Sequence, residues 1–102
     1  SDLKDNGDGG NTVDLPLEGS INHKLATLRQ GRSTKTQTLA DLPKSTKVTV
    51  VDDSSGWHKV EINTKQGGVV LSKTGQKNIS TSGILSGYVS KELITKDELS
   101  KK

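Results

Sequence analysis

The chain has only two aromatic side chains, Trp57 in SSGWHKV and Tyr88 in SGYVSKEL, and it lacks Phe. An exposed indole or phenol ring can stack on a sugar, a peptide or a cation, whereas a buried ring fills a core. Because Trp57 directly follows a Ser-Ser-Gly turn, both uses are open for it. These two rings are the first candidates for a binding surface.

Side chains suited to catalysis are sparse. Nucleophilic hydrolysis needs a Ser or Cys beside a base that a third group orients. The chain lacks Cys, and its two histidines, His23 and His58, belong to no such motif. His58 lies on the apolar side of an alternating run, where we expect a partly buried neutral imidazole. The adjacent Asp52 and Asp53 fall in a turn cluster, where Asp caps backbone amides. We therefore predict a binding module and not an enzyme.

Ligand sets for metals and phosphates fail on spacing. Two histidines without a neighbouring acidic cluster make a poor metal site. Residues 5–11 have the composition of a calcium loop, but Gly7 and Gly9 stand where oxygen ligands are needed. No Gly-rich phosphate loop precedes a helix. We expect no metal and no cofactor.

Charge is spread unevenly along the chain. Residues 1–20 carry five acids and one Lys, a net of −4, whereas residues 21–95 carry eleven bases and five acids, a net of +6. A basic body suits an anionic partner, such as a wall polymer, a nucleic acid or a lipid surface, and it also describes an ordinary solvated surface rich in Lys.

Two of these partners are disfavoured. Proteins that grip single-stranded nucleic acids interleave several aromatics with basic residues, and duplex readers need a recognition element, so two aromatics and no visible recognition helix predict no nucleic-acid partner. No run approaches the ~20 apolar residues that span a bilayer, which predicts no membrane insertion.

Composition divides the chain into three parts. Residues 1–20 are rich in Gly, Asp and Asn and describe a flexible acidic linker. Residues 21–95 form one domain, and residues 96–102 are a short charged tail. The sequence starts without Met, so we interpret it as a fragment, and we expect it to be a monomer.

The domain is expected to be all-β. Residues 46–53, 57–63 and 84–90 alternate apolar and polar side chains, the period of a half-buried strand. Trp57 and Tyr88 both fall on the polar side of their runs, away from the aliphatic core. No stretch shows helical periodicity, so short strands joined by polar turns predict a small barrel or sandwich.

Four segments together resemble the bacterial SH3-like (SH3b) family. They are ATLRQGRST, TLADLPKSTKVTVV, SGWHKV and SGYVSKELI, and they occur in the family's order over residues 25–94. The sequence departs from the family pattern at several places. Arg32 stands where the family favours Pro, and Ser45 where it favours Gly. His58 replaces an aromatic residue, and Tyr88 replaces a Trp.

The segment 63–83 is much longer than the tight hairpin usual in the family. We predict an extended hairpin or insertion here, with strands near 68–72 and 77–81 that turn at residues 73–76. It is either a binding surface particular to this protein or a tolerated surface insertion.

The resemblance implies a small SH3-like barrel with a groove beneath its long first loop, residues 30–38. Trp57 and Tyr88 would then form a shallow aromatic platform with a basic rim, suited to sugars or peptides. The alternative is that Trp57 lies under the first loop and supplies apolar area that a core without Phe lacks. The predicted ligand-binding residues are Trp57, Tyr88, Arg29, Arg32 and Lys35.

The same resemblance implies a module that binds cell-wall peptidoglycan, through its peptide or its glycan, and that targets a larger secreted or envelope protein such as a wall hydrolase. Its place would be extracellular or in the cell envelope. The alternative is an interaction or scaffold domain that docks a protein partner, or another domain of the parent protein, on its long insertion or on its edge strands. Such docking on the insertion needs an apolar patch on 63–83. The side chains that would form this patch are Val69, Val70, Leu71 and Ile79.

Overall fold

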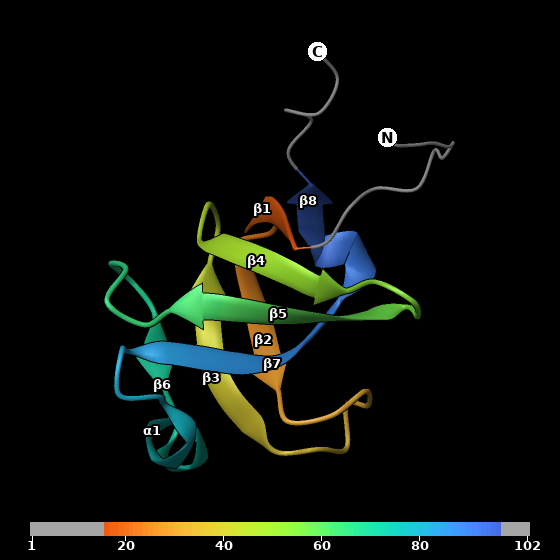
Figure 1. Cartoon of the computed structure of the whole chain (residues 1–102). Coiled ribbons are helices and arrows are strands. Elements are labelled where there is room, and N and C mark those ends of the chain that lie inside the picture. The colour runs from red at the N-terminus through yellow and green to blue at the C-terminus, as the bar shows by residue number, and fades with distance from the viewer. Residues whose placement is uncertain (1–15, 97–102) are drawn as a thin grey trace, which may run out of the picture.

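The structure is a computed structural model that describes residues 16–96 (Figure 1). Its elements in chain order are β1 (Leu17–Ile21), β2 (Leu25–Arg29), β3 (Thr38–Pro43), β4 (Lys47–Asp52), β5 (Trp57–Asn63), β6 (Val70–Leu71), α1 (Lys73–Asn78), β7 (Ile84–Ser90), the 3₁₀ helix η1 (Lys91–Leu93) and β8 (Ile94–Lys96). Within these residues, no helix combines the length and the apolar character needed to cross a membrane.

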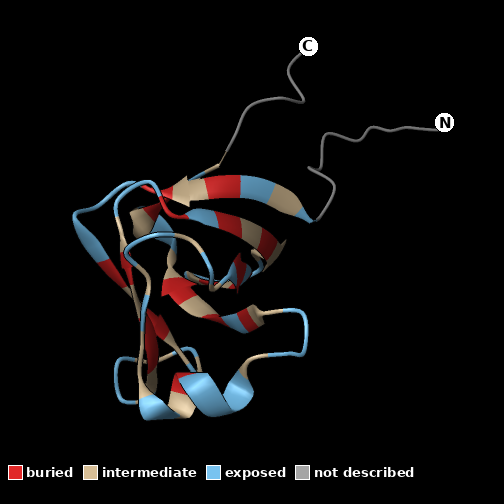
Figure 2. Ribbon diagram, turned by 90° about the vertical axis from the view of Figure 1, so that its left-hand side faces the viewer, coloured by how far each residue is buried: buried red, intermediate tan, exposed pale blue. Residues whose placement is uncertain are grey.

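The strands form one antiparallel sheet in the order β6-β3-β2-β7-β5-β4-β1-β8. The sheet curls, so that β4, β5 and β7 lie in front of β2 and β3 in Figure 1. This arrangement is a small barrel-like domain, and it confirms the predicted all-β class. Buried and exposed residues alternate along the strands (Figure 2), as the period of two in the sequence predicted.

The core is aliphatic and draws on seven strands. It consists of Ile21, Ala26, Leu28, Leu39, Ala40, Leu42, Val48, Val50, Val60, Ile62, Leu85, Val89 and Ile94. Neither aromatic ring belongs to this buried cluster. Trp57 and Tyr88 are half-buried on the outer side of their strands, which confirms that alternation turns them away from the core.

The domain extends beyond the predicted boundaries at both ends. β1 begins at Leu17, inside the segment assigned to the linker, and pairs with both β4 and β8. At Gly19 a Cβ would lie 2.9 Å from the carbonyl oxygen of Thr95, so the close approach of β8 requires glycine there. The composition of residues 1–20 did not indicate this strand, because its Gly19 and Ser20 are residue types typical of linkers. Residues 1–15 and 97–102 lie outside the described residues.

The segment 63–83 is not the predicted hairpin. The first predicted strand appears only as β6, which pairs with β3. The second predicted strand, near 77–81, is absent from the described segment, and the predicted turn at 73–76 is the first turn of α1. Ser72 caps this helix, because its hydroxyl accepts a hydrogen bond from Gly75 N at 3.0 Å.

Apolar side chains of this segment pack inward. Val69, Leu71 and Ile79 lie partly buried against the core cluster. The helix sits close on β3, because a Cβ at Gly75 would collide with the carbonyl group of Leu39. The segment therefore completes the domain at the β3 end, and only Val70, with 62% of its surface exposed, faces solvent as a large apolar side chain.

Substitution of Gly75 by Ala tests this close packing. Ala favours an isolated helix over Gly, yet the added Cβ would meet the backbone of β3. We expect Gly75→Ala to lower the free energy of unfolding by about 1–3 kcal/mol, the usual cost of overpacking. Urea denaturation measures it, with Gly67→Ala as control, because a Cβ there meets nothing within 4 Å. A stabilised Gly75→Ala variant would contradict the packing described.

Ser45 is strained in a way that glycine would relieve. Its φ is +76°, and among the described residues it is the one non-glycine with positive φ. We expect Ser45→Gly to raise the free energy of unfolding by about 0.5–1 kcal/mol, since a left-handed conformation penalises a Cβ. Thermal denaturation should show a gain for Ser45→Gly and none for Ser45→Ala, which keeps the Cβ. Equal behaviour of the two variants would contradict this explanation.

Candidate functional site

A hollow of about 410 Å³ opens beside Trp57. It lies between β2, the loop after β2, the start of β5 and the end of β7 with η1. Its volume falls in the range of about 300–1,000 Å³ that is usual for small-molecule sites. The residues that line it are Leu25, Thr27, Arg29, Thr34, Trp57, Ser90, Glu92 and Leu93.

Trp57 is the first residue of β5, and the turn before the strand holds its backbone in place. Ser55 Oγ donates to the Trp57 carbonyl at 2.9 Å and accepts from Trp57 N at 3.2 Å. The turn is joined to η1, because Lys91 N donates to the Gly56 carbonyl at 2.8 Å. Trp57 also pairs with Ser90 across the β5–β7 ladder. These contacts fix the backbone at Trp57 on both sides, and its half-buried indole lines the hollow.

Arg29 lines the same hollow and is anchored by the loop after β2. Its Nη1 donates to the Thr36 carbonyl at 3.0 Å. Thr36 also orders the loop itself, because its hydroxyl donates to the Ser33 carbonyl at 2.7 Å and accepts from Gly31 N at 3.2 Å. One arm of the guanidinium is therefore committed to the loop, and the side chain is positioned before any ligand arrives.

Tyr88 lies next to the hollow and not in its lining. It is the cross-strand partner of Arg29 on one side and of Lys59 on the other. The guanidinium carbon of Arg32 lies 4.7 Å from the centre of the Tyr88 ring, a cation–π contact. Arg32 Nη2 also donates to Asp52 Oδ2 at 3.2 Å. Of the two rings of the predicted platform, Tyr88 therefore has one face covered by Arg32.

The structure brings the five predicted site residues into one region but not into one surface. Trp57 and Arg29 line the hollow, and Tyr88 and Arg32 form a stacked pair beside it. Lys35 is exposed on the loop, where its backbone N donates to Ser33 Oγ at 3.0 Å, and it does not line the hollow.

Sequence reasoning missed several residues of the lining. Leu25 is 53% exposed although it is large and apolar. The alternation of Leu25, Thr27 and Arg29 on the outer side of β2 is a signal that could have found them. Glu92 lies in η1, which the sequence does not predict. Hydrogen bonds from the Ser90 side chain and from its own backbone lower the pKa of Glu92, so its carboxyl is charged at neutral pH.

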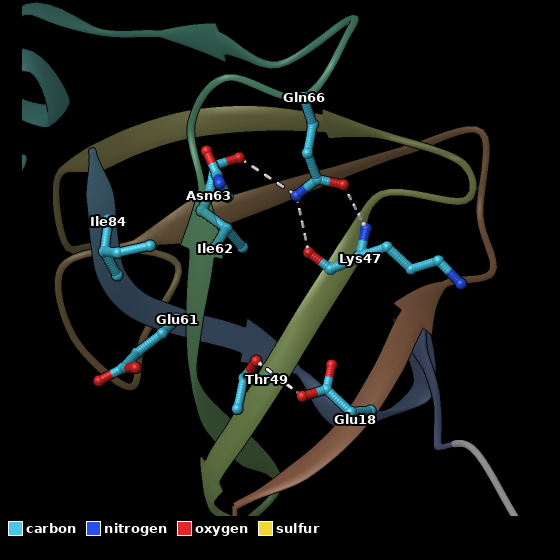
Figure 3. A pocket seen from close by; sticks show the side chains of 8 residues that line it. All are labelled: Glu18, Lys47, Thr49, Glu61, Ile62, Asn63, Gln66 and Ile84. Atoms are coloured by element: carbon cyan, nitrogen blue, oxygen red, sulfur yellow. Dashed lines mark hydrogen bonds between the residues drawn. The ribbon is translucent and has the colours of Figure 1, made fainter. Parts of the chain in front are cut away.

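A second hollow, of about 370 Å³, lies over β1, β4 and β5 (Figure 3). Thr49 stands between Glu18 and Glu61 in the sheet register and donates to Glu18 Oε2 at 3.4 Å. The side-chain amide of Gln66 pairs with both backbone groups of Lys47, at 2.8 Å from N and 2.9 Å from O. These polar groups serve internal contacts, and no predicted site residue lies here.

The described residues contain no group of three or more His, Cys, Asp or Glu side chains that could hold a metal ion. His58 is 5% exposed, and its Nδ1 lies 3.1 Å from the Ser55 carbonyl oxygen. Burial, helped by the charge of Lys96, lowers the pKa of His58 below its usual 6.5. The nearby Asp53, which pairs with Lys96 at 3.0 Å, opposes this shift only in part.

The lowered pKa of His58 makes stability depend on pH. Because the unfolded chain binds a proton more readily at this position, protonation favours unfolding. The contribution of His58 is full above the unfolded pKa of about 6.5 and is lost as pH falls through the lowered folded pKa. We expect the urea midpoint to decrease from pH 7 to pH 5, and less so in His58→Gln. An identical decrease in both proteins would assign the effect to other groups.

Comparisons with family models, with curated proteins and with solved structures find no match to this chain. The family resemblance and the function therefore depend on the residues and on the geometry described above.

Proposed function

We propose that this chain is a non-catalytic bacterial SH3-like binding module that targets a larger secreted or envelope protein to cell-wall peptidoglycan, through its peptide or its glycan. The observation that carries the proposal is the placement of Trp57. The only Trp of the chain is absent from the buried core and forms a wall of an open hollow instead. A core so poor in aromatics would gain from burying this ring, so its exposure is consistent with a binding role.

The lining of the hollow suits a ligand with both apolar and polar parts. The indole of Trp57 and the exposed Leu25 offer apolar faces, and Arg29 and Glu92 offer opposite charges. Hydroxyl groups complete the wall. Sugars and short peptides combine flat apolar surfaces with hydrogen-bonding groups, and both can stack on an indole. The affinity need not be high, because tethering to a wall polymer raises the effective concentration of the attached protein.

A second candidate is docking of a protein partner at β6. Val70 is exposed, and among the described strands β6 pairs only with β3, so its other edge could accept an added strand. The rest of the predicted apolar patch on 63–83 is not available as a surface of this kind, because Val69, Leu71 and Ile79 pack against the core. This leaves the wall-binding proposal with the better-formed surface.

Sedimentation with purified peptidoglycan sacculi tests the proposal. We expect the wild-type chain to be retained and Trp57→Ala to lose about tenfold in affinity, the effect of removing an aromatic anchor. Circular dichroism establishes that both are folded, and Val70→Ala serves as a control that should bind like wild type. If the wild-type chain stays in the supernatant at low and moderate salt, the proposal fails and the β6 edge becomes the better candidate.

A further inference from the structure

Arg32 forms a bridge over the outer face of the sheet, directly beside the Trp57 hollow. The cross-strand register places Arg29, Tyr88, Lys59 and Asp52 in one row over β2, β7, β5 and β4. Arg32 comes from the loop after β2, stacks on the ring in this row and ends on the carboxylate of Asp52. Tyr88 is the cross-strand partner of Arg29, and such partners have Cβ atoms about 5 Å apart. The Arg32 guanidinium, which lies over the Tyr88 ring, is therefore about one strand away from Arg29.

Asp52 is the one carboxylate in this row, which holds the cations Arg29 and Lys59 and is crossed by Arg32. Its Oδ1 accepts from Ser54 N at 2.9 Å and from Ser54 Oγ at 2.7 Å, so the turn holds this oxygen in place. Among the described residues, its Oδ2 accepts a hydrogen bond from Arg32 alone. The two side chains are 45% and 38% exposed. A pair this exposed is weak and exchanges readily with other anions.

We propose that Asp52 occupies at Arg32 the place that a carboxylate of the ligand takes, so that the hollow together with the adjoining Arg32 selects ligands that carry a free carboxylate. This inference rests on the proposed function, because the ligand concerned is the one that the Trp57 hollow binds. The forked guanidinium matches a carboxylate with two hydrogen bonds. Arg29 has one arm committed to Thr36 and keeps the rest of its fork for the same group.

A charge of the opposite sign in the same lining fixes the direction of such a ligand. Glu92 lines the hollow from η1, and its carboxyl is charged at neutral pH. It repels an anion there, so the acidic end of the ligand points toward Arg29 and Arg32. Trp57 lies in the same lining and contacts the apolar part of the ligand. The class of ligand is thus a peptide with a free carboxylate, or a sugar acid.

Small probes test this selectivity without the cell wall. The full chain, labelled with ¹⁵N, is titrated with N-acetyl-alanine, with its uncharged amide and with glucuronic acid, at matched ionic strength. We expect the carboxylates to shift the Arg32 Nε–H and Tyr88 ring resonances and the amide to shift neither. The comparison of N-acetyl-alanine with glucuronic acid shows whether a peptide or a sugar acid is preferred.

Two isosteric variants separate the bridge from general charge. Asp52→Asn removes the internal competitor and should bind the carboxylate probes roughly two- to fivefold more tightly, the range open to an exposed ion pair. Asp53→Asn removes the same charge from the neighbouring Asp53–Lys96 pair and should bind like wild type. Equal shifts by acid and amide, or no gain in Asp52→Asn over Asp53→Asn, would overturn the inference.

Sacculi whose carboxyl groups have been converted to amides distinguish this inference from the proposed function. We expect weaker retention of the wild-type chain on the amidated sacculi than on the native ones. Equal retention on both overturns carboxylate selection and leaves wall binding intact. Absence of binding to either, together with discrimination between acid and amide probes, overturns wall binding and supports carboxylate selection.

Discussion

The antiparallel register of β5 with β7 is the constraint on which the core and the site both depend. The two strands pair over seven consecutive positions. This register turns Val60 and Ile62 of β5 and Leu85 and Val89 of β7 into the core. It leaves Trp57 and Tyr88 outside. Because side chains alternate with a period of two, a slip by one residue would reverse both sets. The same pairing that buries the aliphatic core therefore presents the rings.

Gly87 extends this constraint to β2. A Cβ at this position would lie 2.7 Å from the Arg29 carbonyl oxygen and 2.8 Å from the Leu28 side chain. Its absence lets β7 approach β2 closely enough for Arg29 and Tyr88 to pair. The basic side of the hollow and the stacked ring are brought together by one missing side chain. A binding surface on a domain this small depends on backbone contacts, because few side chains are available to set its shape.

Period-two alternation made much of this predictable. It located β4, β5 and β7 and assigned Trp57 and Tyr88 to the outer side, because a half-buried sheet forces that pattern on the sequence. It could not find α1, whose sequence KTGQKN has no apolar periodicity. That helix is stabilised by its Ser72 cap and by contact with β3, and tertiary contacts of this kind override weak local propensity. β1 was lost for a similar reason, since its pairing partners are remote in sequence.

The candidate site was predictable in its residue types but not in its layout. The register could place Tyr88 beside Arg29, yet no local pattern connects Arg32 with Asp52, twenty residues further along the chain. Arg32 has the planar, charged head that both of its contacts need, the stack on the Tyr88 ring and the ion pair with Asp52. The Arg32 side chain therefore joins the loop after β2 to the end of β4, over the Tyr88 ring of β7. Arg32 thus covers one face of the Tyr88 ring and places a cation beside the hollow that Trp57 and Arg29 line.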